Sequence, residues 1–222
     1  MGLPVNFDSV ALDGLLADWM SALHEFAVEA VVVLGPDPFG QRPDRIVAAV
    51  HPPRFLNAAL ALAETQELGA PWRAAGAPLV AWQHIAKANP GPGSRWRLLW
   101  QAHGFQSVVW LEFPLPSGRA FECFMFSPRE FHERAEAAAL VWSALNIWPL
   151  FKRTLASASS PLSPREGECL VLAFEGLTGR QTAERLGCTE RTVAYHMANV
   201  LAKLRVDNKM SAIQRACWLG LI

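Results

Sequence analysis

Apolar and polar positions in the first 127 residues follow the spacing of helices in some stretches and of strands in others. Residues 8–29 show the spacing of an amphipathic helix, and the apolar runs EAVVVLG and RIVAAV predict two strands. PRFLNAALALAETQEL and SRWRLLWQAHG predict two further helices, and the second groups Trp96 with Trp100. QSVVWLEFPL and RAFECFMFS flank a Pro-Ser-Gly turn at 116–118, which predicts a pair of strands. Helices flanking a mainly antiparallel sheet make an α/β/α sandwich the expected fold.

The tetrapeptide SPRE occurs at 127–130 and again at 163–166, and each copy predicts the start of a helix. In Ser-x-x-Glu, the two side chains satisfy backbone N–H groups that the first helical turn leaves unpaired. Proline at the first helical position loses no hydrogen bond. The apolar residues that recur on one face of the helix expected after the first copy are Phe131, Ala135, Ala138, Trp142, Leu145 and Trp148. Pro149 is expected to kink or restart that helix.

The short polar segment SASSPLS is the best linker in the chain and places a domain boundary near residues 156–162. The expected organisation is a domain at 1–156, a linker at 157–162 and a second domain at 163–222. The fold class is α+β with two domains, of which the second is predicted to be an all-α helix-turn-helix bundle.

The second SPRE opens the first helix of that bundle. Ser163 caps it, and the helix is expected to turn Leu170, Val171 and Phe174 inward and to end near Gly176.

A Gly-containing turn follows between two further helix starts. Thr178 and Gln181 form another capping box, Gly187 suits the left-handed end of the second helix, and Thr189 caps the third. Two short helices joined by such a turn are the helix-turn-helix arrangement.

The third helix of the bundle separates polar from apolar side chains. At about 100° per residue, one arc of about 100° holds Thr192, Tyr195, His196, Asn199 and Lys203. A separate apolar stripe contains Val193, Met197, Val200, Leu201 and Leu204. Short hydroxyl, imidazole, phenol and amide groups can read base edges in the major groove, while Arg191, Lys203 and cap N–H groups hold phosphates. The alternative is that this polar face is only solvated. The preceding short helix and its Gly-containing turn disfavour it, because together they complete a helix-turn-helix. The predicted DNA-binding residues are Thr178, Thr189, Arg191, Thr192, Tyr195, His196, Asn199, Lys203 and Lys209.

These 60 residues resemble the DNA-binding domain of the LuxR type, the quorum-sensing family of regulators. The positions that match the family pattern are Glu166, Leu170, Gly176, Thr192, Val193, His196, Asn199, Lys203, Leu204, Asn208 and Lys209. The last two open a final helix, which in relatives forms the dimer contact on DNA. Ala194 departs from the pattern, because relatives often carry a basic residue there. The loss of a phosphate contact would weaken the affinity for DNA and would make that affinity less dependent on salt.

The resemblance also implies that the N-terminal domain binds acyl-homoserine lactones. The segment APLVAW supplies the expected Trp82, and the stretch around Gly104 is similar. Other positions depart from the family chemistry: Phe55 stands where a tryptophan is expected, and no tyrosine precedes Tyr195. The family's Asp-Pro is replaced by Ala-Pro or by Glu67, depending on where a deletion is placed. A buried lactone or amide needs polar partners, so these departures indicate a divergent receptor with another ligand.

Tryptophan is concentrated in the N-terminal part, where five of them fall within 39 residues. Flat aromatic side chains can line an apolar pocket, although they can equally fill a core or a dimer interface. The predicted ligand-binding residues are Phe55, Glu67, Trp72, Trp82, Trp96, Trp100, Trp110 and Phe113.

Composition and charge set limits on the class of function. The formal net charge is zero, but 12 basic and 14 acidic residues precede residue 161, whereas 8 basic and 6 acidic residues follow. The four cysteines lack metal-site spacing and are interpreted as core residues.

No signal peptide and no apolar run of membrane-spanning length is evident, so a cytoplasmic location is expected. The dispersed histidines pair with no nucleophile, so no catalytic residue, metal or cofactor is predicted. Asp37 lacks the acidic partners of a phosphoacceptor, which disfavours a response regulator.

The predicted function is a homodimeric transcription regulator that binds a double-stranded DNA operator, with no membrane partner. Its N-terminal domain is expected to sense a small molecule that gates DNA binding, either an acyl-homoserine-lactone-like signal or another apolar or aromatic one. The alternative is a regulator that forms heterodimers with other LuxR-type proteins and ignores small molecules.

Overall fold

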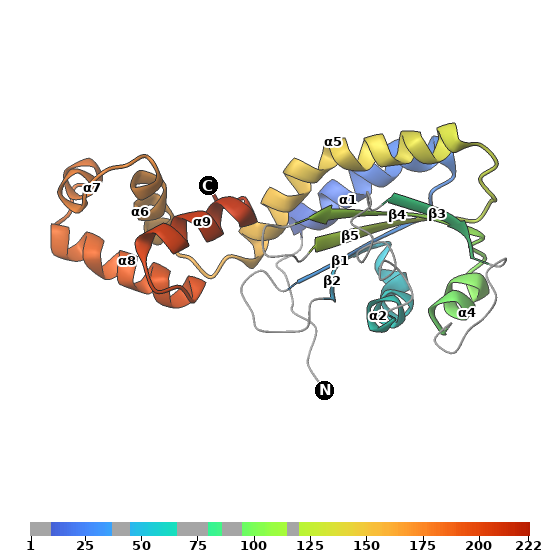
Figure 1. Ribbon diagram of the computed structural model, residues 1–222, viewed down its shortest axis with the longest axis horizontal. Helices are drawn as coiled ribbons and strands as arrows, with labels where there is room; N and C mark the ends of the chain where they lie inside the picture. Colours follow the sequence, from blue (N-terminus) through green and yellow to red (C-terminus); the bar gives the residue numbers. More distant parts are fainter. Residues whose placement is uncertain (1–9, 37–44, 66–79, 86–94, 115–119) are drawn as a thin grey trace. The chain divides into compact units, whose positions relative to one another are not determined.

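The computed structural model describes residues 10–36, 45–65, 80–85, 95–114 and 120–222 (Figure 1). By its contacts the chain divides into two compact units, Ser9–Phe151 and Lys152–Ile222, and the division falls inside one long helix. The domain limits expected from the sequence, with a linker at 157–162, stay a prediction.

A five-stranded sheet forms the middle of the first unit. Its strands are β1 (Ala30–Gly35), β2 (Ile46–His51), β3 (Val80–His84), β4 (Ser107–Pro114) and β5 (Ala120–Ser127). The order across the sheet is β2-β1-β5-β4-β3, and every neighbouring pair is antiparallel. The predicted strand pair is therefore confirmed as β4 and β5, while the turn expected at 116–118 lies outside the described residues.

Helices cover both faces of this sheet and confirm the α/β/α sandwich. They are α1 (Val10–Leu23), α2 (Leu56–Glu64), α4 (Arg95–Ala102) and α5 (Arg134–Ser159). Figure 1 shows α1 and α5 on one face and α2 and α4 on the other.

Strand alternation decides which side chains meet which helices. Phe113 of β4 lies on the α5 side, where its ring stacks on Trp148 with 3.9 Å between ring centroids. On the same side, α1 is tied to α5 because Trp19 Nε1 donates a hydrogen bond to Ser143 Oγ at 2.8 Å. Trp110, three residues before Phe113, lies on the opposite face and packs in the core beneath α2 and α4.

The first SPRE does not begin a helix, so that prediction is wrong. Ser127 is the last residue of β5, and its Oγ accepts a hydrogen bond from the backbone N–H of Arg129 at 3.3 Å. Helix α5 begins only at Arg134. There the carboxylate of Glu136 accepts the backbone N–H of His132 at 3.2 Å. Strand pairing has overridden the local capping signal.

Helix α5 continues through Pro149, so the helix does not restart there, and the alternative of a kink stays a prediction. Its buried positions are Ala137, Leu140, Ala144, Phe151, Leu155 and Ala156. The face identified in the sequence, which includes Trp142 and Leu145, is mostly exposed. Trp148 of that face still stacks on Phe113 of β4, whereas Trp142 and Leu145 are exposed.

The second unit is all-helical, as predicted. Its helices are α6 (Pro164–Phe174), α7 (Gly179–Leu186), α8 (Glu190–Leu204) and α9 (Lys209–Leu219), and the end of α5 belongs to it as well. Leu170 of α6 is buried as expected, but Val171 and Phe174 are exposed, which corrects the sequence interpretation. None of the helices in the described part of the chain is long and apolar enough to cross a membrane.

Candidate functional site

The helix-turn-helix is set by local capping bonds that the sequence predicted. In α6, Ser163 Oγ accepts the N–H of Glu166 at 3.4 Å, and the Glu166 carboxylate accepts the N–H of Ser163 at 2.7 Å. In α7, Thr178 and Gln181 make the same reciprocal pair. Gly187 ends α7 in the left-handed conformation with φ of 65°, which glycine adopts without strain. These bonds fix where α8 begins.

The apolar side of α8 attaches it to the rest of the bundle. Val193, Val200 and Leu204 are buried, and Met197 and Leu201 are partly buried, so the predicted stripe is confirmed. Val193 packs in a small core with Cys169 of α6 and Ala183 of α7. This packing leaves the other side of α8 facing away from the bundle.

Predicted DNA-binding side chains gather on that outward side. Arg191 and Tyr195 are exposed, and Thr192 and Asn199 are partly exposed about two turns apart. An exposed row of hydroxyl, phenol and amide groups on a single helix has the chemistry that base edges in the major groove require.

The three predicted threonines have partners within the bundle. Thr189 Oγ1 accepts the N–H of Thr192 at 3.1 Å, and the two hydroxyls lie 2.8 Å apart in a hydrogen bond. Thr178 Oγ1 donates to the side-chain oxygen of Gln181 at 3.0 Å. In His196, Nδ1 is buried and has no hydrogen-bond partner within the described part of the chain, so only the other ring nitrogen is available for an external contact. Capping and DNA contact must therefore share the same hydroxyls.

An ion pair joins α8 to α6. Lys203 Nζ lies 2.7 Å from the carboxylate of Glu166, whose side chain is only 4% exposed, whereas that of Lys203 is 39% exposed. Burial acts to raise the pKa of Glu166, but the hydrogen bonds from Lys203 and from Ser163 outweigh it and lower the pKa below its ordinary value. Lys209 donates to the carbonyl oxygen of Leu177 at 3.3 Å. The sequence singled out Glu166 as a cap but missed its role as the partner of Lys203.

The predicted ligand-binding residues are only partly brought together. Phe55, Trp96, Trp100 and Trp110 belong to the core beneath α2 and α4. Phe113 lies on the opposite face of the sheet and is separated from them. Trp82 lies in β3, where its backbone pairs with that of Val109 in β4.

Two more of these predicted residues, Glu67 and Trp72, lie outside the described residues.

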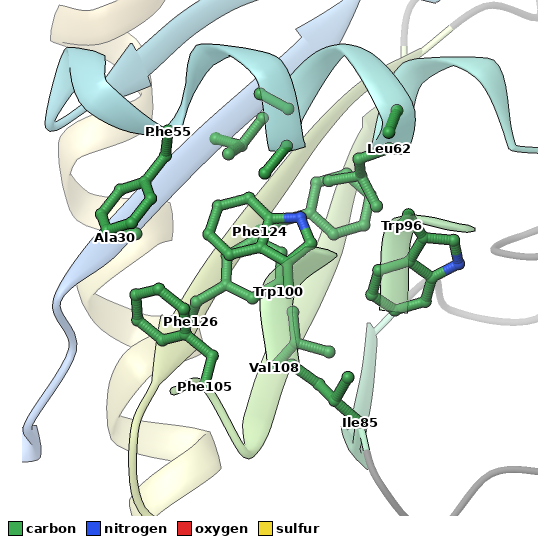
Figure 2. Close-up of a cluster of buried hydrophobic side chains, with 14 of the residues drawn as sticks. Ala30, Phe55, Leu62, Ile85, Trp96, Trp100, Phe105, Val108, Phe124 and Phe126 are labelled. Atoms are coloured by element: carbon green, nitrogen blue, oxygen red, sulfur yellow. The ribbon is translucent and has the colours of Figure 1, made fainter. Parts of the chain in front are cut away.

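We name the rings of that core the aromatic layer, which consists of Phe55, Trp96, Trp100, Phe105, Trp110, Phe124 and Phe126. Trp100 stacks on Phe126 with ring centroids 3.6 Å apart and an angle of 3° between the planes. Phe55 and Phe105 meet Trp100 at 5.6 and 5.3 Å between centroids. Figure 2 shows Trp100 among these rings and Trp96 apart from them at one edge. The aromatic layer is thus in direct ring-to-ring contact in its middle.

Polar atoms are present at the border of the aromatic layer. Glu122 of β5 points to the same face as Phe124, because the two residues are two apart in a strand. Arg45 holds the Glu122 carboxylate through two hydrogen bonds, Nε to Oε1 at 2.7 Å and Nη2 to Oε2 at 3.1 Å. Arg45 also donates to the carbonyl oxygen of Thr65 after α2. Sequence reasoning missed this pair, although a carboxylate inside the apolar strand AFECFMF was a usable signal.

Two indole nitrogens inside the aromatic layer, Trp100 Nε1 and Trp110 Nε1, are buried without a hydrogen-bond partner among the residues that the structure describes. A buried N–H without an acceptor is costly, and most such groups in folded proteins are paired. Within those residues, no group of three or more His, Cys, Asp or Glu side chains is placed to hold a metal ion.

Comparison with known proteins gives a family for the second unit. Residues 160–216 match the family of bacterial regulatory proteins called the luxR family. The transcriptional activator protein AnoR of Acinetobacter nosocomialis is 48% identical over 61 residues, which are 28% of this chain and 26% of AnoR. The transcriptional activator protein LuxR of Aliivibrio fischeri is 32% identical over 91 residues, which are 41% of this chain and 36% of that protein. The matched segments thus span about a quarter to a third of the length of these relatives.

Solved structures also align with most of the chain. The crystal structure of Escherichia coli SdiA covers 94% of this chain and 90% of that chain, with 20% identity and a TM-score of 0.45. SdiA in complex with octanoyl-rac-glycerol covers 99% of this chain and 98% of that chain, with 20% identity and a TM-score of 0.41.

Proposed function

Because residues 160–216 form a domain of the luxR family, we propose that the chain is a DNA-binding transcription regulator. The observation that carries this proposal is the division of α8, whose apolar stripe is buried against α6 and α7 while Arg191 and Tyr195 face outward. A helix held in this way can enter the major groove, with its short polar groups against base edges and its cations against phosphates.

Selection from a random double-stranded DNA library with the full-length chain tests this proposal, because it needs no prior operator. The chain should enrich one sequence motif. Replacing Tyr195 or Asn199 by alanine should weaken binding to that motif by about 1–3 kcal/mol if either side chain reads a base. Gln214 is exposed on α9, and Gln214→Ala is the matched control. Failure to enrich any motif, or equal affinity of all variants, contradicts the assignment of α8 as the reading helix.

The active form is proposed to be a homodimer, and the exposed apolar face of α5 supports this. Trp142 is 66% exposed and Leu145 is 43% exposed, and they are three residues apart on one side of the helix. Large apolar side chains that lie together on a surface are typical of an interaction site. Trp142→Glu should shift the full-length chain towards monomer in sedimentation velocity. Leu98→Glu, which changes an equally exposed leucine on α4, should leave the association state unchanged.

The N-terminal unit is proposed to bind a small molecule that controls DNA binding. Aromatic residues from the turn before α2, from α4 and from the sheet gather on one face, with a buried ion pair at the border. Such a mainly apolar site with a few polar groups is typical of ligand-binding proteins. Added ligand should raise the melting temperature of the full-length chain and change its affinity for the selected DNA.

One observation favours the alternative of a regulator that ignores small molecules and forms heterodimers. Trp100 and Phe126 are in direct contact, so their rings fill the middle of the aromatic layer. A panel of acyl-homoserine lactones and aromatic metabolites separates the two proposals. Unchanged melting temperatures with every compound, together with intact DNA binding, would favour the alternative.

A further inference from the structure

The chain treats its buried indoles in two different ways. On the α5 side of the sheet, Trp19 is buried and its N–H donates to Ser143 Oγ at 2.8 Å. On the other side, Trp100 and Trp110 are 0% and 1% exposed, and their N–H groups have no acceptor among the described residues. The N–H of Trp19 is thus paired, whereas those of Trp100 and Trp110, both in the aromatic layer, have no acceptor among the described residues.

Packing does not explain why tryptophan occupies these two positions. Their neighbours Phe55, Phe105 and Phe126 are phenylalanines, which supply aromatic area without a polar atom to bury. An unsatisfied buried donor disfavours the folded state by about 5- to 150-fold in its equilibrium constant. A bound molecule with an oxygen acceptor would remove this cost by accepting a hydrogen bond from the indole. The two unpaired donors therefore favour binding of a molecule that carries an acceptor.

We propose that Trp100 and Trp110 donate hydrogen bonds to an uncharged, flat, aromatic or alicyclic ligand that bears a carbonyl or similar oxygen acceptor. The proposal rests on the small-molecule sensing proposed above and specifies the chemical class of the ligand. The ligand is uncharged because the surrounding side chains are apolar and the adjacent Glu122 is already neutralised by Arg45. It is flat because the rings of the aromatic layer contact one another closely, so that a flat molecule can be accommodated with the smallest displacement.

The two donors are distinct positions rather than one. Trp110 faces Phe124 with 6.1 Å between centroids, Phe124 is 6.4 Å from Phe126, and Phe126 carries the stacked ring of Trp100. A ligand with one acceptor would therefore satisfy one indole, and a ligand with two acceptors would be needed to satisfy both. This separation allows each indole to be tested on its own.

A matched pair of probes isolates the hydrogen bond. Acetophenone and ethylbenzene share a benzene ring with a two-carbon substituent, and only acetophenone has an acceptor oxygen. Titrated into the full-length chain, acetophenone should bind about tenfold more tightly than ethylbenzene. In the chain labelled with ¹⁵N at the indole nitrogens, the N–H proton resonance of Trp100 or Trp110 should move downfield with acetophenone and not with ethylbenzene.

Conservative variants assign the effect to these two residues. Trp100→Phe and Trp110→Phe keep a ring and remove the N–H, and at least one of them should reduce the ratio of the two affinities to about one. Trp19→Phe removes an indole that is already paired, and it should leave the ratio unchanged. The unsubstituted chain with its two probes remains a test even where a variant does not fold.

Several results would overturn the inference. They are equal binding of the two probes, binding of neither, and a ratio that both phenylalanine variants leave intact. DNA selection uses no ligand, so its outcome is independent. A chain that selects its DNA motif but shows no preference for acetophenone refutes this inference alone, whereas one that prefers acetophenone but selects no motif refutes the proposed function alone.

Discussion

Loss of the ion pair between Lys203 and Glu166 should loosen the C-terminal unit without unfolding the sheet. Lys203→Met removes the charge and keeps an apolar stem of similar length, so packing changes little. Glu166 would then remain buried with its hydrogen bonds from Ser163, whose backbone N–H lies 2.7 Å away. The perturbation therefore isolates the contact between α8 and α6.

The magnitude follows from the burial of the two partners. Removal of one member of a fully buried pair costs about 3–5 kcal/mol, whereas exposed pairs contribute about 0–1 kcal/mol. Here Glu166 is 4% exposed but Lys203 is 39% exposed, and solvent screens the lysine. The remaining capping bond also offsets part of the loss. A destabilisation of about 1–3 kcal/mol is the intermediate value that these conditions predict.

Amide hydrogen exchange on the full-length chain measures this change where it occurs. A loss of about 1–3 kcal/mol should accelerate exchange in α6 and α8 by about 5- to 150-fold, while amides in β1 and β5 serve as an internal reference. Arg180→Met is the matched control, because Arg180 pairs with Glu184 at 3.1 Å with both side chains largely exposed. Its effect should stay below about 0.5 kcal/mol.

The pH dependence has a definite sign. The folded-state pKa of Glu166 is lowered from its ordinary value of 4.5, so its contribution is fully present above the unfolded-state pKa. That contribution is lost as the pH falls through the folded-state pKa. The difference in exchange between the parent chain and Glu166→Gln should be constant above about pH 5 and should shrink below it. Exchange in α6 and α8 that Lys203→Met leaves unchanged, or a difference for Glu166→Gln that persists at low pH, would refute the reasoning.

Three further predictions follow from single contacts. Ser163→Ala removes the hydroxyl that caps the N–H of Glu166 and should cost about 0.5–2 kcal/mol, measured by exchange in α6. Gly35→Ala places a methyl group 2.1 Å from the ring of Phe121 and should lower the melting temperature by the equivalent of about 1–3 kcal/mol; an unchanged melting temperature would show that the ring moves freely. Arg191→Ala should reduce the slope of log affinity against log salt by about 1 if Arg191 holds a phosphate, and an unchanged slope would exclude that contact.

The second SPRE and the caps at Thr178 and Thr189 could be predicted because these capping bonds join residues three apart. The first SPRE has the same four letters, but its serine is the end of β5, paired with Ser107 of β4. Pairing with a distant strand has no signature in four residues. Local chemistry therefore predicted the C-terminal unit well and failed where a tertiary contact competed for the same residue.

Helix α5 shows a second limit of periodicity. Leu140 and Ala144 are four residues apart, and Trp142 and Leu145 are three apart, so both sets satisfy a helical pattern. The sequence favoured the face with Trp142 and Leu145, yet these two are exposed and Leu140 and Ala144 are buried. Spacing alone cannot tell a face that fits closely against a sheet from one that stays exposed. In β4, by contrast, the three-residue separation of Trp110 and Phe113 was enough to place them on opposite faces, so the error there was avoidable.

The departures from LuxR-type chemistry and the unpaired indoles bear on the same question of what the N-terminal unit binds. Phe55, for which the resemblance predicts a tryptophan, offers no polar atom and packs against Trp100 and Phe105. The unpaired indole donors in the aromatic layer instead come from α4 and β4. A ligand that satisfies one of these donors must present its acceptor to the indole on α4 or to the indole on β4. Binding of acyl-homoserine lactones with no shift of either indole N–H resonance would show that the ligand accepts no hydrogen bond from Trp100 or Trp110. The two unpaired donors would then have no role in ligand binding.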